Sequence, residues 1–255
     1  MRILVSNDDG VYSPGLHALA RVARKFGSVR IVAPDVEQSA MSHAITIRRP
    51  LHYVRTQVDG NVAYRVDGTP ADCVALGAHH WDRVDLVLTG INLGLNIGHN
   101  IWHSGTVAAA KQASFLGIPA IAFSAPFDFS LAAEEQELDY DAIESHIERV
   151  IEVFLETQGM PLLNVNFPEG KPQDILWTRM SVRNYEGSVI PSEDPMGRKH
   201  YWFAETPRER VEEGTDRWAI EQGYVSLTPL RLNLTDDDRL TELRSASAGP
   251  GFSGS

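Results

Sequence analysis

Short apolar runs alternate with helix-like stretches over the first 125 residues, and this alternation constrains the fold more than any other feature of the chain. The apolar runs have the length of strands, and the stretches between them carry apolar residues at helical spacing. The runs occupy residues 3–5, 29–33, 84–88 and 120–123, and helices are expected at 16–26 and 106–116. Strands that alternate with helices form right-handed βαβ units. The sequence therefore predicts an α/β fold in which a mostly parallel sheet carries helices on both faces.

Turn and capping residues place further elements. Asp59-Gly60 is a strong turn signal and predicts a hairpin over residues 51–66. Thr69 predicts a helix start, with Pro70 at the first helical position and Asp72 near the positive end of the helix dipole. An amphipathic helix is expected at 140–157, a core strand at 162–167, and an acidic surface connection at 126–139.

The alternation of strands and helices stops near residue 176. Residues 177–203 hold a turn-rich stretch between two aromatic-bearing runs, which predicts an extended β-hairpin arm. A strand at 223–232 and a short helix at 236–244 are expected to follow, and the small, Gly/Ser-rich residues 245–255 are expected to be a disordered tail. The predicted organisation is an α/β core at 1–176, an arm with a closing strand and helix of the same domain at 177–244, and the tail.

Composition excludes some functions. The 255 residues suit one large domain, and a net charge of −11 argues against broad binding of nucleic-acid polymers, which requires basic surface. A small anionic substrate stays possible, because a metal ion or a helix terminus supplies local positive charge. The single cysteine, Cys73, excludes an intrachain disulfide and fits a reducing compartment. The N-terminus does not resemble a signal peptide, and no apolar run reaches the ~18 residues of a membrane span. We therefore expect a cytoplasmic protein without membrane contact.

The first polar cluster, Asn7-Asp8-Asp9-Gly10, directly follows the first predicted strand. Ligands of open α/β sheets bind beyond the carboxyl ends of the strands. Two adjacent carboxylates repel each other unless a cation neutralises them, and a turn at Gly10 would bring both to one point. A polar Asp-Gly turn without a ligand is the alternative interpretation, and this cluster alone does not decide between the two.

Two more clusters follow the next core strands. Residues 33–43 form a loop of small and polar residues that includes Ser39, and by itself this loop indicates only a surface connection. Residues 89–100 are rich in glycine and asparagine, which permits tight backbone paths and close approach to a ligand. They lead to Ser104-Gly105-Thr106 at a predicted helix start. Such a terminus binds phosphate through its N–H groups, although ordinary capping is an equal alternative.

The combination is more informative than each cluster alone, because all three are expected at one edge of the sheet. Asp8 and Asp9 would supply charged oxygen ligands, and Ser39 and Asn92 neutral ones. Ligation by oxygen alone favours a hard cation, Mg²⁺ or Mn²⁺. The helix at Ser104 would hold a phosphate beside this metal. Together they predict stabilisation of charge on a phosphoryl group during its transfer.

Other sites are less probable on sequence grounds. The G-x-G-x-x-G fingerprint, the P-loop and the G-x-S-x-G elbow are missing. Cys73 is expected to pack in the core, and His79-His80 are expected to be solvated at a helix end. His43 and His103 lie inside the candidate site loops and are the better histidine candidates.

In these blocks the chain closely resembles the SurE family, the survival-protein nucleotidases, over roughly residues 1–235. The resemblance is carried by residues 3–11, 32–35 with Ser39, 68–74, 90–98 and 104–110, and in the C-terminal part by Asp194-Pro195-Met196-Gly197, Tyr201-Trp202, Gly214-Thr215-Asp216 and residues 223–230. It implies a Rossmann-like core and a metal-dependent hydrolase, a phosphatase of the 5′-nucleotidase class. Activity on nucleoside 3′-monophosphates and on short polyphosphate is implied as well.

The resemblance also implies roles for individual residues. The metal ligands of the family match Asp8, Asp9, Ser39 and Asn92, and its phosphate-contacting positions match Asn96, Ser104, Gly105 and Thr106. The implied partners are a nucleotide substrate and further copies of the chain, in a homodimer or homotetramer that exchanges the C-terminal arm.

Two departures from the family pattern concern the substrate. Val36-Glu37-Gln38 stand before Ser39 where many members carry Arg-Asn-Arg, so the substrate preference is open. His103 stands where many members carry tyrosine, and it either contacts the phosphate or fills the space of the tyrosine.

We expect Asp8 and Asp9 to be the catalytic residues. Asp8 is the expected base for attack by water on phosphorus, and a covalent aspartyl-phosphate on Asp8 is the rival route. Two other classes of protein remain as alternatives. One is a non-catalytic nucleotide sensor, and the other is a dinucleotide enzyme, against which the missing glycine fingerprint argues.

Overall fold

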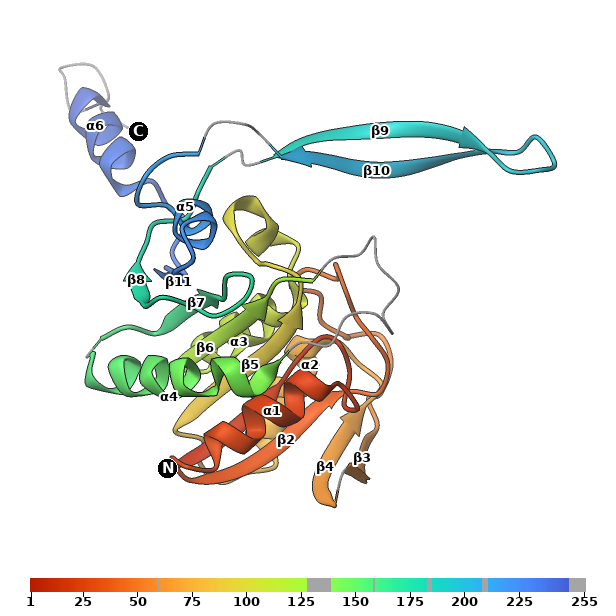
Figure 1. The fold of residues 1–255 in the computed structure, drawn as a ribbon, viewed down its shortest axis with the longest axis vertical. Coiled ribbons are helices and arrows are strands. Elements are labelled where there is room, and N and C mark those ends of the chain that lie inside the picture. Colours follow the sequence, from red (N-terminus) through yellow and green to blue (C-terminus); the bar gives the residue numbers. More distant parts are fainter. Residues whose placement is uncertain (59, 128–138, 158, 183–184, 208–210, 248–255) are drawn as a thin grey trace, which may run out of the picture.

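The structure is a computed structural model that describes residues 1–58, 60–127, 139–157, 159–182, 185–207 and 211–247. Within these residues a nine-stranded sheet forms the core, in the order β3-β4-β2-β1-β5-β6-β7-β11-β8, and a separate two-stranded hairpin forms the arm. Figure 1 shows the core sheet with helices on both faces and the arm extending away from it. The predicted α/β class, with a mostly parallel sheet and a C-terminal arm, is therefore confirmed.

The centre of the sheet is parallel. β1 (Arg2–Ser6) lies between β2 (Ser28–Pro34) and β5 (Leu86–Leu93), and β6 (Ala120–Ala125) and β7 (Leu162–Asn166) follow in register. Most residues of these strands are buried and apolar, as expected for strands covered on both faces, and the main exception is the start of β2. Their carboxyl ends lie along one edge, so the loops after β1, β2 and β5 are neighbours.

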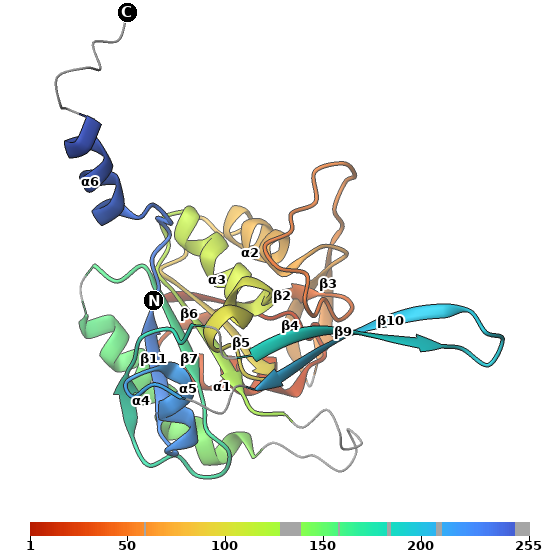
Figure 2. The ribbon, with the colours of Figure 1, turned by 90° about the horizontal axis from the view of Figure 1, so that it is seen from above.

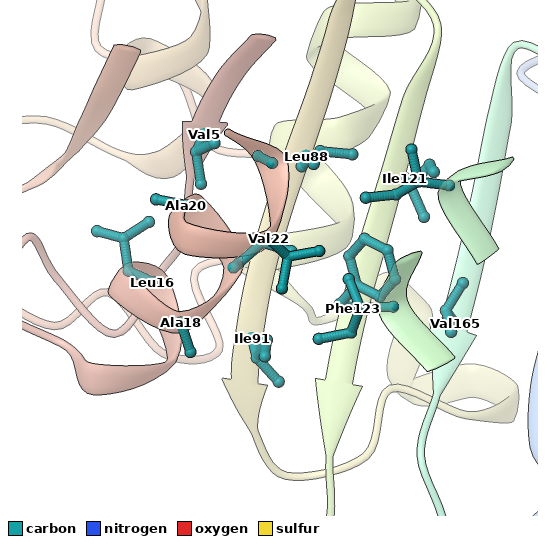
Figure 3. Packing of buried hydrophobic residues seen from close by; sticks show 14 of the residues in the cluster. Val5, Leu16, Ala18, Ala20, Val22, Leu88, Ile91, Ile121, Phe123 and Val165 are labelled. Atoms are coloured by element: carbon teal, nitrogen blue, oxygen red, sulfur yellow. The ribbon is translucent and has the colours of Figure 1, made fainter. Parts of the chain in front are cut away.

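Two helices cover each face. α1 (Pro14–Ala23) and α4 (Tyr140–Glu156) contact each other on one face, above a cluster that includes Val5, Leu88, Phe123 and Val165 (Figure 3). α2 (Pro70–His79) and α3 (Gly105–Phe115) pack together on the other face. The predicted start of α2 is confirmed, because Thr69 and Asp72 form a reciprocal capping box.

One edge of the sheet is formed by a hairpin. β3 (Tyr53–Val58) and β4 (Asn61–Val66) are antiparallel to each other, and β4 runs parallel to β2. Gly60 has a φ of +76°, a conformation that favours glycine and allows the tight turn. The hairpin predicted over 51–66 is confirmed, although residue 59 itself lies outside the described residues.

The other edge is built from C-terminal residues. β11 (Val225–Pro229) is antiparallel to β7, and β8 (Ile175–Trp177) pairs parallel with β11. The sequence did not indicate β8, which crosses the boundary predicted at residue 176. Nor did it indicate α5 (Asp216–Glu221) or the short 3₁₀ helix η1 (Gly98–Trp102).

The arm consists of β9 (Tyr185–Glu193) and β10 (Lys199–Pro207), which pair antiparallel along their whole length. Seen from above in Figure 2, it projects well beyond the core. α6 (Asp237–Ser247) lies apart from the sheet and includes residues 245–247 of the predicted tail. Residues 248–255, and most of the connection predicted at 126–139, lie outside the described residues. In the described part of the chain, every helix is too short or too polar to cross a membrane.

Candidate active site at the carboxyl edge of the sheet

The turn after β1 presents two carboxylates, as predicted. Asn7 Nδ2 donates to the Gly10 carbonyl at 3.0 Å, and Gly10 has a φ of +101°. The backbone then meets the loop after β2, because Gln38 N donates to the Asp8 carbonyl at 2.8 Å. Ser39 is the next residue, so the first and second polar clusters lie side by side.

The Asp8 carboxylate lies against the N-terminus of α3. Thr106 Oγ1 donates a hydrogen bond to Asp8 Oδ1, and the backbone of Gly105 and Thr106 lies near enough to lower the pKa of this carboxyl. Asp8 is only 3% exposed, and its burial raises the pKa of the carboxyl above the ordinary value, against the opposing effect of these contacts. A Cβ atom on Gly105 would lie 2.8 Å from Asp8 Cβ and Oδ2, so this approach requires glycine.

Asp9 carries the second carboxylate. Burial, followed by the negative charges of Asp8 and Glu37, raises the pKa of Asp9 to about 8. The backbone of Leu93 at the end of β5 lies near enough to lower this pKa in part, whereas the buried Oδ2 atom has no hydrogen-bond partner. A buried carboxylate oxygen without a partner beside another carboxylate is unfavourable unless a cation compensates it.

The two uncharged candidate metal ligands, Asn92 and Ser39, differ in exposure. Asn92 is near the end of β5 rather than in a loop, and its Nδ2 donates to the Gly94 carbonyl at 2.6 Å, which leaves the amide oxygen as the acceptor of this side chain. Ser39 is exposed, and its Oγ donates to Glu37 Oε1 at 2.6 Å. The structure thus brings Asp8, Asp9 and Asn92 to one edge, with Ser39 on the neighbouring loop.

The predicted phosphate contacts divide into two groups. Ser104 caps α3, where its Oγ accepts a hydrogen bond from Val107 N at 3.0 Å, and Gly105 and Thr106 form the first turn. Asn96 instead points into the core, where its Nδ2 donates to Ser124 Oγ at 2.9 Å. Its contact with phosphate stays a prediction.

The two histidine candidates differ. The exposed His103 directly precedes Ser104, and its carbonyl accepts a hydrogen bond from Ser42 N at 3.0 Å. His43 stacks on Phe115 and bonds Gln112 in the later turns of α3, away from the terminus at Ser104. Cys73 is buried and His79 and His80 are exposed, as expected.

The residues fit a hard divalent cation by their chemistry. They offer oxygen donors alone, two of them charged, and one buried oxygen without a partner. Among the described residues no group of three or more His, Cys, Asp or Glu side chains is arranged to hold a metal ion. That finding is compatible with the predicted set, in which just Asp8 and Asp9 belong to those types.

Sequence reasoning missed one buried carboxylate near this site. Asp216 accepts a hydrogen bond from the backbone N–H of Gly98, at the start of η1, at 2.9 Å. The motif Gly214-Thr215-Asp216 contributed to the family resemblance, but its chemistry was not assigned. The motif marked Asp216 as a residue of interest, but it did not indicate the contact with Gly98.

A protein-family model described as survival protein SurE matches residues 3–187 of the chain. The chain belongs to the SurE family. It is 51% identical over 241 residues to 5′-nucleotidase SurE 1 of Thermus thermophilus, an alignment that covers 92% of this chain and 93% of that protein. It is 44% identical over 253 residues to 5′-nucleotidase SurE of Deinococcus radiodurans, covering 96% and 92%. The crystal structure of the SurE protein from Aquifex aeolicus superimposes with a TM-score of 0.81 at 37% identity, covering 97% of this chain and 100% of that one.

Proposed function

We propose that this chain is a divalent-metal-dependent phosphatase that hydrolyses nucleoside 5′-monophosphates to nucleoside and phosphate. The shared name of its SurE relatives supports the enzyme class, a 5′-nucleotidase. The proposal extends to nucleoside 3′-monophosphates and to short polyphosphate, because the proposed contacts of the site are with the phosphoryl group that these substrates share.

One observation carries the proposal: the contact between the Asp8 carboxylate and the first turn of α3. It places a pair of carboxylates beside a helix N-terminus, whose N–H groups and dipole favour phosphate. A metal-binding pair and a phosphate-binding terminus in contact are what metal-assisted phosphoryl transfer requires.

Asp8, Asp9, Asn92 and Ser39 would hold the cation, Mg²⁺ or Mn²⁺. When bound, it neutralises the carboxylate pair and polarises the phosphoryl oxygens. The N–H groups of Gly105 and Thr106, with the Ser104 hydroxyl, orient the phosphate. Asp8, whose carboxylate contacts the phosphate-binding terminus, is the proposed base that accepts the proton of the attacking water.

The rival route forms an aspartyl-phosphate on Asp8 that water then hydrolyses. A single turnover quenched in acid separates the routes, because the aspartyl-phosphate leaves phosphate covalently bound to the protein and direct attack does not. Label in an enzyme carboxylate after turnover in H₂¹⁸O would also overturn direct attack, whereas label in the released phosphate is common to both routes when water attacks phosphorus.

We also propose that the arm joins copies of the chain in a homodimer or homotetramer. Its described residues expose large apolar side chains to a degree unusual for a monomer surface. These exposed residues are Val189, Ile190, Met196, Tyr201, Trp202 and Phe203.

Phosphate release from a panel of nucleoside monophosphates and short polyphosphate tests the activity. The assay is run with Mg²⁺, Mn²⁺ or EDTA on the wild type, on Asp8→Asn and on the control Asp174→Asn, which removes an exposed carboxylate at β8. We expect metal-dependent release that EDTA and Asp8→Asn abolish and that Asp174→Asn retains. Absence of release from folded wild type with every metal and substrate would leave a non-catalytic nucleotide binder as the better interpretation.

A further inference from the structure

Asp216 is a fully buried carboxylate, 0% exposed, in a segment to which the proposed chemistry assigns no role. It accepts hydrogen bonds from donors on two separate parts of the chain. Oδ2 accepts the N–H of Gly98 at 2.9 Å. Oδ1 accepts the N–H of Ser181 at 2.9 Å, the hydroxyl of Ser181, and the N–H of Arg217 at 2.8 Å. A buried carboxylate that accepts this many hydrogen bonds is well satisfied, but its burial becomes costly once a donor is lost.

The hydrogen bond to Oδ2 connects Asp216 with the segment that precedes the candidate active site. Gly98 begins η1, and Ile97, which precedes it, has no side chain able to cap this short helix. Asp216 supplies the missing acceptor from 118 residues further along the chain. η1 is followed by His103 and then by Ser104, which caps α3. The position of Gly98 therefore constrains the segment that delivers the phosphate-binding terminus.

The hydrogen bonds to Oδ1 connect Asp216 with Ser181 at the base of the arm. Ser181 lies on the outgoing segment shortly before β9, and Asp216 lies on the returning segment after β10. The two segments also pair through their backbones, because Asp216 N donates to the Arg179 carbonyl at 2.9 Å and Arg179 N donates to the Gly214 carbonyl at 3.1 Å. The same carboxylate thus holds both the base of the arm and the start of η1.

We propose that Asp216 is a positioning residue, which fixes residues 98–103, the segment that leads to the phosphate-binding terminus at Ser104, against the base of the arm. This inference rests on the proposed function for its effect on substrate. Asp216 touches neither substrate nor metal in this scheme, and it acts through Gly98. Loss of Asp216 should therefore affect the residues that bind phosphate. The carboxylate pair of Asp8 and Asp9 should be unaffected, because the turn after β1 holds it.

The test uses Asp216→Asn, because asparagine keeps one acceptor oxygen and replaces the other by an NH₂ group. With its oxygen toward Ser181 and Arg217, the amide presents a donor to the N–H of Gly98 and breaks that contact. Asp174→Asn is the matched control, since it removes one carboxylate from the same C-terminal part without reaching η1. Ser181→Ala removes one donor on the arm side and leaves the Gly98 contact in place.

The first readout is kinetic. We expect Asp216→Asn to raise KM for a nucleoside 5′-monophosphate and the inhibition constant for inorganic phosphate by about ten- to a hundredfold, because small misplacements of a binding group have large effects. The metal concentration for half-maximal activity should stay within about twofold, since the carboxylate pair is undisturbed. Ser181→Ala and Asp174→Asn should resemble the wild type. A defect in folding alone would reduce the fraction of active enzyme and so lower the apparent kcat. It would leave KM and the inhibition constant for inorganic phosphate unchanged.

The second readout does not need activity. Amide hydrogen exchange at residues 98–103 should be faster in Asp216→Asn than in the wild type, and unchanged in Asp174→Asn. Unchanged exchange together with unchanged KM in folded Asp216→Asn would overturn the proposal. An inactive wild type with the expected exchange difference would overturn the proposed function and leave the positioning role intact. If Asp216→Asn does not fold, Asp216→Ser replaces it, because the shorter hydroxyl cannot reach both Ser181 and Gly98.

Discussion

The hydroxyl of Thr106 donates a hydrogen bond to Oδ1 of Asp8, although 98 residues separate the two in the sequence. Through this bond the turn after β1 is joined to the first turn of α3. The Asp8 carboxylate therefore lies beside the helix terminus that is proposed to bind phosphate. A cation held by Asp8 would lie next to that phosphate, so metal and phosphate should bind in a mutually favourable way.

Replacement of Gly105 by alanine should push the Asp8 carboxylate away from the first turn of α3. The added Cβ would lie 2.8 Å from Asp8 Cβ and Oδ2, a distance at which one of the groups must move. We expect kcat/KM to fall at least about tenfold and the free energy of unfolding to fall by about 1–3 kcal/mol. Phosphate release and urea unfolding measure the two effects. Gly187→Ala in the arm is the control, because its Cβ would meet no atom within 4 Å, and equal behaviour of both variants would contradict the expectation.

The stability of the metal-free protein should depend on the proton at Asp9. Its pKa is raised from 3.8 to about 8 on folding, so between these values the folded state retains a proton that the unfolded state has released. The contribution of this proton to the free energy of unfolding is at its maximum below pH 3.8, and it is lost as the pH rises to about 8.

Melting temperatures in EDTA, measured between about pH 5 and pH 9, should therefore fall more steeply for the wild type than for Asp9→Asn. Mg²⁺ should flatten the slope of the wild type, because a bound cation favours the ionised carboxylate. Parallel slopes for the two proteins in EDTA would show that Asp9 does not hold this proton.

Asp72 should contribute to stability more than an ordinary first-turn acid does. It is buried, and its two oxygens accept the N–H of Thr69 at 2.9 Å and the N–H of Thr46 at 3.0 Å. Asp72→Ala leaves both N–H groups without a partner and should lower the free energy of unfolding by about 2–4 kcal/mol. Asp238→Ala, in the exposed first turn of α6, should cost no more than about 1 kcal/mol. Denaturant titrations compare the two, and similar losses would mean that the contacts of Asp72 carry little energy.

Features whose cause lies within a few residues were predictable from the sequence. The helix start at Thr69 and the turn at Gly10 both depend on neighbours in the chain, and both occur as expected. The buried strands were found through their apolar runs, although β5 continues to Leu93, beyond the predicted end at residue 88. Its glycine and asparagine residues resemble a loop, yet Asn92 and Leu93 pair with β6.

Features created by tertiary contacts were not predictable in the same way. β8 has three residues, too few to show a period, and it exists because β11 offers a free edge. The role of Asp216 depends on Gly98, which lies far away in the sequence, so neither residue alone indicates the contact. For the same reason the approach of Asp8 to Thr106 could be expected only from the general rule that the carboxyl ends of parallel strands share one edge.

The exposed apolar side chains of the arm lead to a prediction about assembly. Phe203 is 91% exposed and pairs across the hairpin with Val189, which is also exposed. A solvent-exposed phenylalanine on a projecting hairpin is expected to pack against another copy of the chain. Phe203→Asp should place a charge in that contact and shift a dimer or tetramer toward the 28.2 kDa monomer.

Light scattering after size exclusion measures this shift, and Ser192→Asp, at a polar position of the same hairpin, is the control. The core sheet should be intact in both variants, because the arm pairs only with itself among the described residues. A monomeric wild type would exclude an interface through the arm at the concentration measured. A Phe203→Asp variant as fully associated as the wild type would instead locate the interface elsewhere on the molecule.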